Sequence, residues 1–220
     1  HRVEPRPSQP KRRGLMARLP RAFYARPTLE VARDLLGKVL LHRTPSGPTS
    51  GIIVEVEAYI GESDPACHAA PGPTRRNAPM YGSPGHAYVY LNYGVHYLMN
   101  VVTEPELSPA AVLIRSLDPL EGIDLMRRRR MRPRTVRHAK PAARISDRAL
   151  CKGPGNLTHA MGITLKDTGI DLLGDQLSIE DRGVRFERIS WSPRIGISVG
   201  TERPWRCFVE GHAGVSGKRL

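Results

Sequence analysis

The chain has 220 residues, a length that suits one domain with a substantial hydrophobic core. Lys and Arg number 34 against 21 Asp and Glu, so the formal net charge is +13 and the isoelectric point is about 10.3. An isoelectric point above ~9 is typical of nucleic-acid-binding domains, although a ribosome-associated protein or a membrane-surface protein would carry a similar charge. No segment reaches the ~20 apolar residues of a membrane-spanning helix, so we expect no association with a membrane core.

The three cysteines, Cys67, Cys151 and Cys207, lie far apart and form no Cys-x-x-Cys pair. This spacing disfavours a disulfide framework and a zinc ribbon. It is typical of a protein in a reducing compartment, and we therefore expect a cytoplasmic location.

The first quarter of the chain predicts a leader, a helix and two strands. Residues 1–18 are rich in Pro, Arg and Lys without apolar periodicity, which indicates a disordered basic leader before a folded domain over residues 19–220. Thr28 is expected to cap a helix that Gly37 ends. A short strand and a Pro-, Gly- and Ser-rich loop over Thr44–Gly51 should follow.

Gly51–Ile60 has the clearest strand pattern in the chain. Alternation places Glu55, Glu57 and Tyr59, together with Ile53, on one face, and apolar residues on the other. Two carboxylates so spaced are most often a solvated face, but a carboxylate beside aromatic rings in a cleft is also a good general base. A metal site would need further ligands at suitable spacing, and the sequence shows none, so we expect no metal and no cofactor.

The next segments contain the basic and aromatic candidates. Gly61–Pro84 is a long loop, which is usually either functional or disordered, and its basic residues favour function. His86–Val102 reads as a β-hairpin with Tyr93 at its turn. Clustered tyrosines commonly pack across strands, but an aromatic residue at an exposed tip can also insert between stacked bases. Tyr59 and Tyr90 could likewise stack on a purine.

The second half of the chain predicts shorter elements. A strand over Ala111–Ser116 should lead into a helix with Asp118 as its cap and Glu121 completing a capping box. That helix carries Arg127–Arg130, which indicates either a solvated helix face or a phosphate-binding surface, and a basic loop continues through Lys140.

Two further helices and a strand-rich end should follow. Ser146 is expected to cap a short helix. Gly153 should begin another that Gly162 ends. The amides at Gly153 could meet a phosphate, although a plain helix start explains them equally well. Short strands are expected over Leu177–Val209.

Several of these segments, in this order, match the motifs of one protein family. They are Val54–Tyr59 followed by His68, Tyr88–Tyr90, Tyr93-Gly94, Met99-Asn100, Val112–Gly122 and Leu150–Pro154. The chain thereby resembles the alkyladenine (3-methyladenine or methylpurine) DNA glycosylases from about Leu19 to Gly211. It lacks the extended N-terminal region of vertebrate members, so we expect a bacterial member that acts at the nucleoid.

The resemblance implies a fold and an activity. The fold is mixed α+β: a single domain with a curved antiparallel β-sheet, flanked by helices, and a protruding β-hairpin. The activity is that of a monofunctional DNA glycosylase of base excision repair, which flips an alkylated purine out of the duplex and hydrolyses its N-glycosidic bond. Damaged double-stranded DNA is the expected partner, and the expected enzyme is a monomer.

The resemblance also assigns roles to individual residues. Glu57 matches the general base that activates water, and Arg115 matches a residue that helps to hold that water. The base pocket is then walled by Tyr59, His68 and Tyr90, Asn100 takes a position that guards against purines with a 2-amino group, and Tyr93 is the residue inserted into the duplex. We expect DNA phosphate contacts from Arg75, Arg76 and Lys152.

Two other hypotheses remain open from the residues alone. A non-catalytic protein that binds structured nucleic acid would have the same charge and exposed aromatics. A metal-dependent nuclease could use Glu55 and Glu57, but further ligands are missing. Cys67 stands where the family commonly has alanine, which leaves the lesion preference open. The glycosylase hypothesis itself requires an ionised Glu57 beside a cavity that admits one everted base.

Overall fold

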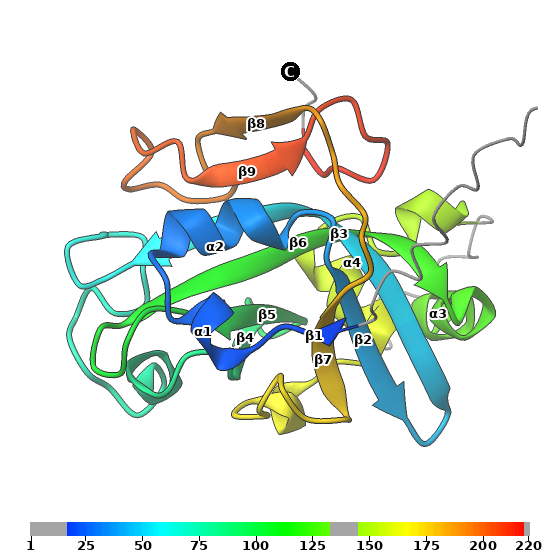
Figure 1. Cartoon of the computed structure of the whole chain (residues 1–220), viewed down its shortest axis with the longest axis horizontal. Coiled ribbons are helices and arrows are strands. Elements are labelled where there is room, and N and C mark those ends of the chain that lie inside the picture. Colours follow the sequence, from blue (N-terminus) through cyan, green and yellow to red (C-terminus); the bar gives the residue numbers. More distant parts are fainter. Residues whose placement is uncertain (1–16, 133–144, 218–220) are drawn as a thin grey trace, which may run out of the picture.

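The computed structural model describes residues 17–132 and 145–217 (Figure 1). Most of the predicted leader and the basic stretch through Lys140 therefore lie outside the described residues. Ala17–Arg18, which we placed in the leader, instead form a short strand paired with Glu180 and Asp181. The leader prediction was wrong for these two residues because their backbone completes the edge of a sheet.

A large antiparallel sheet organises the described part of the chain. Its strands run in the order β1-β7-β2-β3-β6-β5-β4, and β9 pairs with both β3 and β8. The strands are β1 (Ala17–Arg18), β2 (Val39–Thr44), β3 (Gly47–Ile60), β4 (Ala87–Asn92), β5 (His96–Val102), β6 (Ala110–Glu121), β7 (Leu177–Asp181), β8 (Ile189–Ser192) and β9 (Arg206–Val209). This is the antiparallel α+β fold that the resemblance implied, with β4 and β5 as the hairpin.

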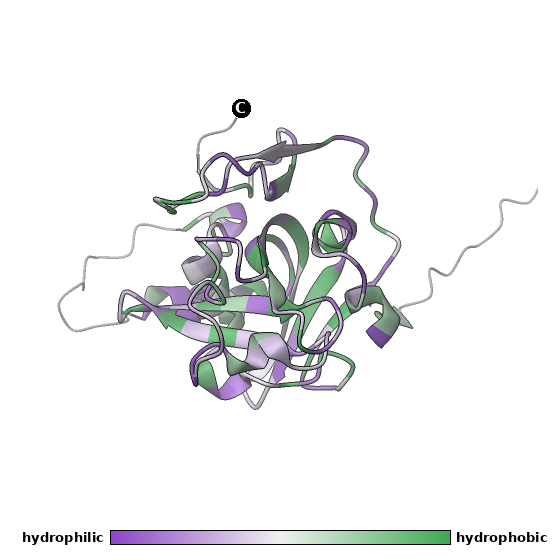
Figure 2. Cartoon of the chain, turned by 90° about the vertical axis from the view of Figure 1, so that its left-hand side faces the viewer, coloured by the Kyte–Doolittle hydropathy of each residue, from purple (hydrophilic) through white to green (hydrophobic). Residues whose placement is uncertain are grey.

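Short helices pack onto this sheet. They are α1 (Arg21–Tyr24), α2 (Thr28–Leu35), α3 (Ile123–Met131) and α4 (Pro154–Met161), with 3-10 turns over Ala78–Tyr81, Asp147–Ala149 and Leu165–Asp167. Helix α2 crosses β3 and β6, with β8 and β9 above it in the view of Figure 1. Figure 2 shows the apolar residues gathered on the inner strands and the helix faces that cover them.

The long central pair β3–β6 positions the predicted site. Both strands extend beyond the ranges expected from the sequence, and register shifts interrupt their pairing near Ile53, Glu55 and Val56. Ile53 packs in the main core with Val54 and Val56, so the alternation predicted for it was wrong. A β-bulge changes which face successive side chains take, and the predicted alternation holds only from Glu55 onward.

The predicted loop over Thr44–Gly51 is instead a tight hairpin between β2 and β3. The two strands pair from Val39↔Ile52 to Thr44↔Gly47, which leaves only residues 45 and 46 for the turn. Gly47 has φ +119, a conformation that only glycine adopts readily. The Pro- and Ser-rich composition correctly predicted a turn here, but the turn is shorter than the predicted loop.

The predicted capping box at Asp118 was also wrong. β6 runs through Asp118 to Glu121, and α3 begins after Gly122, which has φ +72. The two carboxylates have partners elsewhere: His212 lies 3.3 Å from Asp118, and Arg182 lies 2.9 Å from Glu121. Continued pairing of β6 with β3 outweighs the local preference for a helix start.

Other predicted helix boundaries vary in accuracy. Thr28 is the first helical residue rather than the cap, and its hydroxyl donates to Glu104 Oε1 at 2.5 Å. Ser146 precedes a single 3-10 turn and makes no side-chain capping bond. Gly162 ends α4 in the left-handed conformation, as predicted.

We expect Gly122→Ala to destabilise the fold strongly. A Cβ atom at this position would lie 2.4 Å from the Pro48 carbonyl oxygen, and φ is +72. Backbone strain and overpacking together should lower the free energy of unfolding by about 2–5 kcal/mol, measured by urea denaturation. Gly169→Ala is the matched control, because it has φ +82 but no atom within 4 Å. Equal losses in the two variants would contradict the role of the Pro48 contact.

Candidate active site

Glu57 lies in the middle of β3, and its side chain is fully buried. Its Oε1 accepts a hydrogen bond from the Ile195 amide at 2.7 Å, and its Oε2 accepts one from the Tyr59 hydroxyl at 2.9 Å. Arg115 Nη1 lies 3.1 Å from the same Oε2. A carboxylate offers about four acceptor positions, and these three donors use about three of them. Glu57 is therefore a buried carboxylate held by hydrogen bonds, and it does not belong to a solvated face.

Glu55, two residues earlier, is saturated with donors. Its carboxylate accepts hydrogen bonds from Arg115 Nε, Arg206 Nε, the Ser116 hydroxyl, and both the amide and the hydroxyl of Ser216, at 2.7–3.0 Å. Burial raises the pKa of Glu55, but the arginines and the Ser216 amide outweigh it and lower that pKa below its usual value. Glu55 is therefore ionised and has no position left for a water proton.

Arg115 on β6 joins the two carboxylates. Its Nε bonds to Glu55 at 3.0 Å while its Nη1 pairs with Glu57, and the side chain is 8% exposed. Burial lowers the pKa of Arg115, but the charges of Glu57 and Glu55 raise it above its ordinary value. A guanidinium in this position stays charged and fixes the direction of both carboxylates.

A small cavity brings together the predicted pocket residues and is connected to Glu57 through the Tyr59 hydroxyl, while Glu57 itself does not line it. Its lining consists of Tyr59, Ala66, His68, Met80, Tyr88, Tyr90 and Asn100. The four residues predicted to bind the substrate base are all among them, and Tyr59 reaches from this cavity to Glu57. The volume is about 20 Å³, space for about one water molecule. Our expectation of a cavity already sized for a nucleobase was wrong, because the aromatic walls close on one another.

His68 and the tyrosines form these closed walls. The rings of His68 and Tyr90 meet edge to face with centroids 4.4 Å apart, and His68 Nδ1 lies 2.9 Å from the Tyr88 hydroxyl. Burial, and then the charge of Arg76, lower the pKa of His68 to about 4, so the imidazole is neutral at pH 7. The Asn100 amide donates to the Tyr88 carbonyl at 3.1 Å.

Burial keeps the tyrosines of the site protonated. It raises the pKa of Tyr59 and Tyr90, and the negative charge of Glu57 raises that of Tyr59 further. It raises the pKa of Tyr88 to about 12. Tyr59 can therefore act toward Glu57 only as a hydrogen-bond donor.

The hairpin tip carries Tyr93, whose side chain is 86% exposed. Tyr93 and Gly94 have φ of +48 and +68, which confirms the predicted turn. Leu91 and Val95 on either side are also partly exposed. The structure thus presents an aromatic ring to solvent on an apolar tip, instead of packing it with the other tyrosines.

The three predicted phosphate-binding residues differ in their surroundings. Arg75 and Arg76 are exposed on the loop after β3, and the Arg76 guanidinium lies 5.4 Å from the centre of the Tyr90 ring. Lys152 is half-buried and donates to the Ala213 carbonyl at 3.2 Å. Arg76 is therefore close to the cavity, whereas the Lys152 ammonium already holds the C-terminal segment.

Three arginines in the run on α3 have structural partners. Arg129 donates to the Ala160 carbonyl at the end of α4, and Arg130 donates to the Leu150 carbonyl. Arg127 pairs with Asp124 and Asp147. The run is neither a plain solvated face nor a free phosphate-binding surface, because most of its charge fixes α3 against neighbouring segments.

A second buried ion pair supports the site, and sequence reasoning missed it. Arg194 and Asp64 have fully buried side chains and bond through two contacts of 2.6 and 2.8 Å. The Arg194 guanidinium lies 4.7 Å from the Tyr59 ring, and the next residue, Ile195, donates its amide to Glu57. These residues lie in irregular segments without periodicity, so no pattern in the sequence indicates them.

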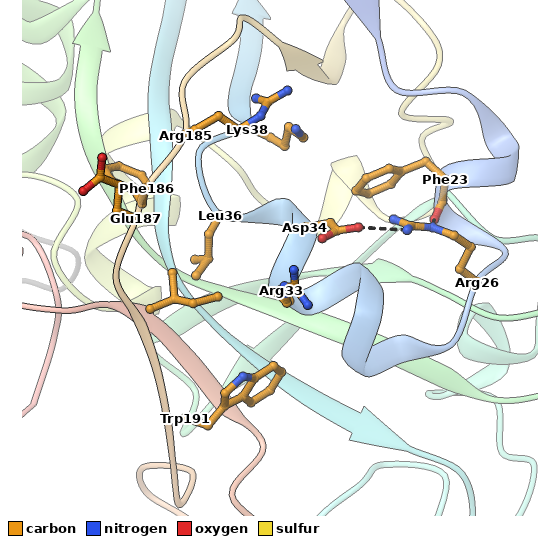
Figure 3. Close-up of a pocket in the computed structure, with 11 residues that line it drawn as sticks. Phe23, Arg26, Arg33, Asp34, Leu36, Lys38, Arg185, Phe186, Glu187 and Trp191 are labelled. Carbon is orange, nitrogen blue, oxygen red and sulfur yellow. Dashed lines mark hydrogen bonds and ion pairs between the residues drawn. The ribbon is translucent and has the colours of Figure 1, made fainter.

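A larger cleft lies elsewhere and lacks comparable chemistry. It has a volume of about 710 Å³ and lies between α2 and the segment leading into β8 (Figure 3). Its Asp34 is paired with Arg26 at 2.8 Å, and its Lys38 and Arg185 both pair with Asp181. These four lining side chains already have ion-pair partners, and none of the described residues that line the cleft is a fully buried carboxylate comparable to Glu57.

Three observations bear on the classes of protein considered at the start. Within residues 17–132 and 145–217, no group of three or more His, Cys, Asp or Glu side chains could hold a metal ion. No helix in the described residues is long and apolar enough to span a bilayer. The three cysteines are buried and unpaired.

Comparison with known sequences decides the family. The family model for methylpurine-DNA glycosylase matches residues 22–213, most of the chain. The chain belongs to the methylpurine-DNA glycosylase family. This confirms the resemblance drawn from the motifs and makes the chain a DNA glycosylase, an enzyme that hydrolyses N-glycosyl bonds, rather than a binding protein without catalysis.

Relatives of high similarity come from several organisms, and each is named as a candidate 3-methyladenine DNA glycosylase. One from Chlorobaculum parvum is 46% identical over 207 residues, covering 93% of each chain. One from Methanocella arvoryzae is 48% identical over 194 residues, which cover 86% of this chain and 91% of the relative. One from Burkholderia lata is 45% identical over 202 residues, which cover 90% and 91%.

We expect the His68 imidazole to titrate at pH about 4, followed by NMR. Because the unfolded chain would titrate near ~6.5, His68 should contribute stability that is present above that pH and lost as the pH falls toward 4. Arg76→Gln should move the midpoint upward without restoring the ordinary value, because burial is the larger cause. Arg75→Gln, next to it on the same loop, should leave the midpoint unchanged. A midpoint near ~6.5 in the unaltered protein would contradict the burial of this ring.

Proposed function

We propose that this family member is a monofunctional enzyme of base excision repair that everts an alkylated purine and releases it by hydrolysis. The observation that carries the proposal is the buried Glu57 carboxylate, held by three donors, one of which, Tyr59, lines a cavity with aromatic walls. The names of the relatives point to 3-methyladenine as one lesion.

The chemistry of the substrate explains what the enzyme must supply. Alkylation at N3 or N7 places positive charge on the purine and makes it a better leaving group. As the glycosidic bond breaks, the sugar gains oxocarbenium character, as in glycoside hydrolysis. The enzyme then needs a negative charge near the sugar and a base that takes a proton from the attacking water.

Glu57 fits both requirements. Its carboxylate is fixed by Arg115, Tyr59 and the Ile195 amide, which leave about one acceptor position for the proton of a water molecule. The water oxygen attacks the anomeric carbon, the bond to the purine breaks, and the water proton passes to the carboxylate. Arg115 remains positively charged throughout and helps to orient the water.

The base pocket would form as the base enters. Tyr59 and Tyr90 offer ring faces on which a purine can stack, at about 1–3 kcal/mol per contact. Since the empty cavity holds about one water molecule, the walls must separate to admit the purine. His68 is neutral at pH 7 and therefore adds no positive charge beside a cationic base. Asn100 lies in this wall, where it would meet the edge of the purine.

The net charge and the exposed hairpin tip support binding to a duplex. The net charge of +13 attracts DNA, and the exposed Tyr93 ring can fill the gap left by the everted nucleotide. Arg75, Arg76 and Lys152 remain predicted phosphate contacts. The cavity lining contains no lysine, so we expect no Schiff-base intermediate and no strand cleavage.

Glu57→Gln should abolish most of the base release from methylated duplex DNA while duplex binding persists. Loss of a general base commonly costs about 10²- to 10⁴-fold in rate, and single-turnover assays with EDTA present would measure it. Glu106→Gln, an exposed carboxylate, serves as control and should be fully active. Full activity of Glu57→Gln would refute the mechanism, and loss of wild-type activity in EDTA would favour a metal-dependent enzyme.

Tyr93→Ser should weaken base eversion because the hairpin loses the ring that replaces the base. The fluorescence change of 2-aminopurine placed next to the lesion would report this, and we expect a smaller amplitude. Leu107→Ser is the control, since Leu107 is 80% exposed and lies on the β5–β6 loop rather than the hairpin tip. Equal signals from Tyr93→Ser and the unaltered enzyme would reject the insertion role.

A further inference from the structure

Glu55 is a buried carboxylate for which the proposed hydrolysis has no direct use. It is fully buried on β3, two residues from Glu57. Isolating a charge from water costs several kcal/mol unless partners compensate it, and Glu55 accepts five hydrogen bonds. Its partners converge from β6, β9 and the segment at Ser216.

Arg115 connects this carboxylate to the proposed catalytic one. All three guanidinium nitrogens are engaged: Nε with Glu55 at 3.0 Å, Nη1 with Glu57 at 3.1 Å, and Nη2 with the Ser216 hydroxyl at 3.2 Å. A guanidinium is planar and rigid, so fixing Nε and Nη2 also fixes where Nη1 points. Glu55 and Ser216 thereby set the position of the charge that faces Glu57.

We infer that Glu55 is a positioning residue for base release, which holds the Arg115 guanidinium against Glu57 and balances its charge. The inference rests on the proposed function of Glu57. Two carboxylates, Glu55 and Glu57, face two guanidiniums, Arg115 and Arg206, so this part of the site is neutral. Without the Glu55 charge, Glu57 would be the only carboxylate paired with the Arg115 guanidinium.

Other groups also act on Glu57 and must stay constant in a test. Arg194 and Tyr90 interact with it electrostatically, and the Tyr59 hydroxyl and the Ile195 amide are hydrogen-bonded to it. Arg194 is balanced by Asp64. A substitution at position 55 leaves these groups in place and changes the charge and the hydrogen bonds that hold Arg115 against Glu57.

The test is Glu55→Gln, assayed by single-turnover release of methylated purine from duplex DNA over a range of pH. A small misplacement of Arg115 should lower the rate by roughly 10- to 100-fold, while the Kd for the duplex stays within about twofold. The acid limb of the pH–rate profile should move to lower pH, because Glu57 would no longer share the positive charge of Arg115 with a second carboxylate. A purely structural role of Glu55 would not move that limb.

Glu180→Gln is the matched control. Glu180 is a buried carboxylate on β7 with an arginine partner, Arg182, at 2.9 Å, and it contacts none of the site residues. It should lose stability without any change in the pH–rate profile. If Glu55→Gln and Glu180→Gln lose rate only in proportion to their folded fraction, with unchanged profiles, the positioning role is overturned.

Ser216→Ala separates geometry from charge and remains informative if Glu55→Gln does not fold. It removes the hydroxyl that links Arg115 Nη2 to Glu55 but keeps every charge and the Ser216 amide. We expect a several-fold loss of rate with no shift of the acid limb. A wild-type rate in Ser216→Ala, or in Glu55→Gln, while Glu57→Gln is inactive would overturn the positioning role and leave the proposed function standing. Activity in Glu57→Gln would instead remove the proposed function itself.

Discussion

The guanidinium of Arg115 between two buried carboxylates is the interaction on which the site depends. Neither Glu55 nor Glu57 has any exposed surface, and an uncompensated buried carboxylate would take up a proton or unfold the surroundings. Arg115 pairs with both carboxylates and Arg206 pairs with Glu55, so each carboxylate has a cationic partner inside the sheet. On the proposed mechanism, a carboxylate held where water is scarce would act more strongly on the cation that develops at the sugar.

The sheet topology explains how these charges meet. At residues 55–57, β3 has β6 on one side and β9 on the other, so arginines from both neighbours reach its polar face. The Asp64–Arg194 pair extends the same arrangement and fixes Tyr59 and the Ile195 amide. The Arg115–Glu55 and Arg194–Asp64 ion pairs thus orient the donors around Glu57. In enzymes, residues that contact the catalytic side chains commonly determine whether those side chains are positioned precisely enough for catalysis.

The sequence was most informative where a residue type and a periodic pattern coincide. The carboxylates of β3, the hairpin with Tyr93 at its turn and the end of α4 at Gly162 were all predicted, because strand alternation and turn chemistry are local properties. The helix start at Asp118 failed because strand pairing with β3 outweighed a local capping signal. Arg194, Arg206 and Ser216 gave no signal, because their importance comes from contacts with residues distant in the chain. The narrow cavity was not predictable either, since ring packing depends on tertiary contacts.

The contacts that hold Glu55 and Glu57 join segments that lie far apart in the chain, which affects when they form during folding. Ile195 reaches Glu57 across 138 positions and Ser216 reaches Glu55 across 161. Contacts between such distant segments carry the largest loop-closure entropy and tend to form late. A polypeptide caught at an intermediate stage would hold Glu57 with an incomplete set of neighbours. On the proposed mechanism, hydrolysis would then require these late contacts, so that partly folded chains would bind DNA through their charge without cutting bases from it.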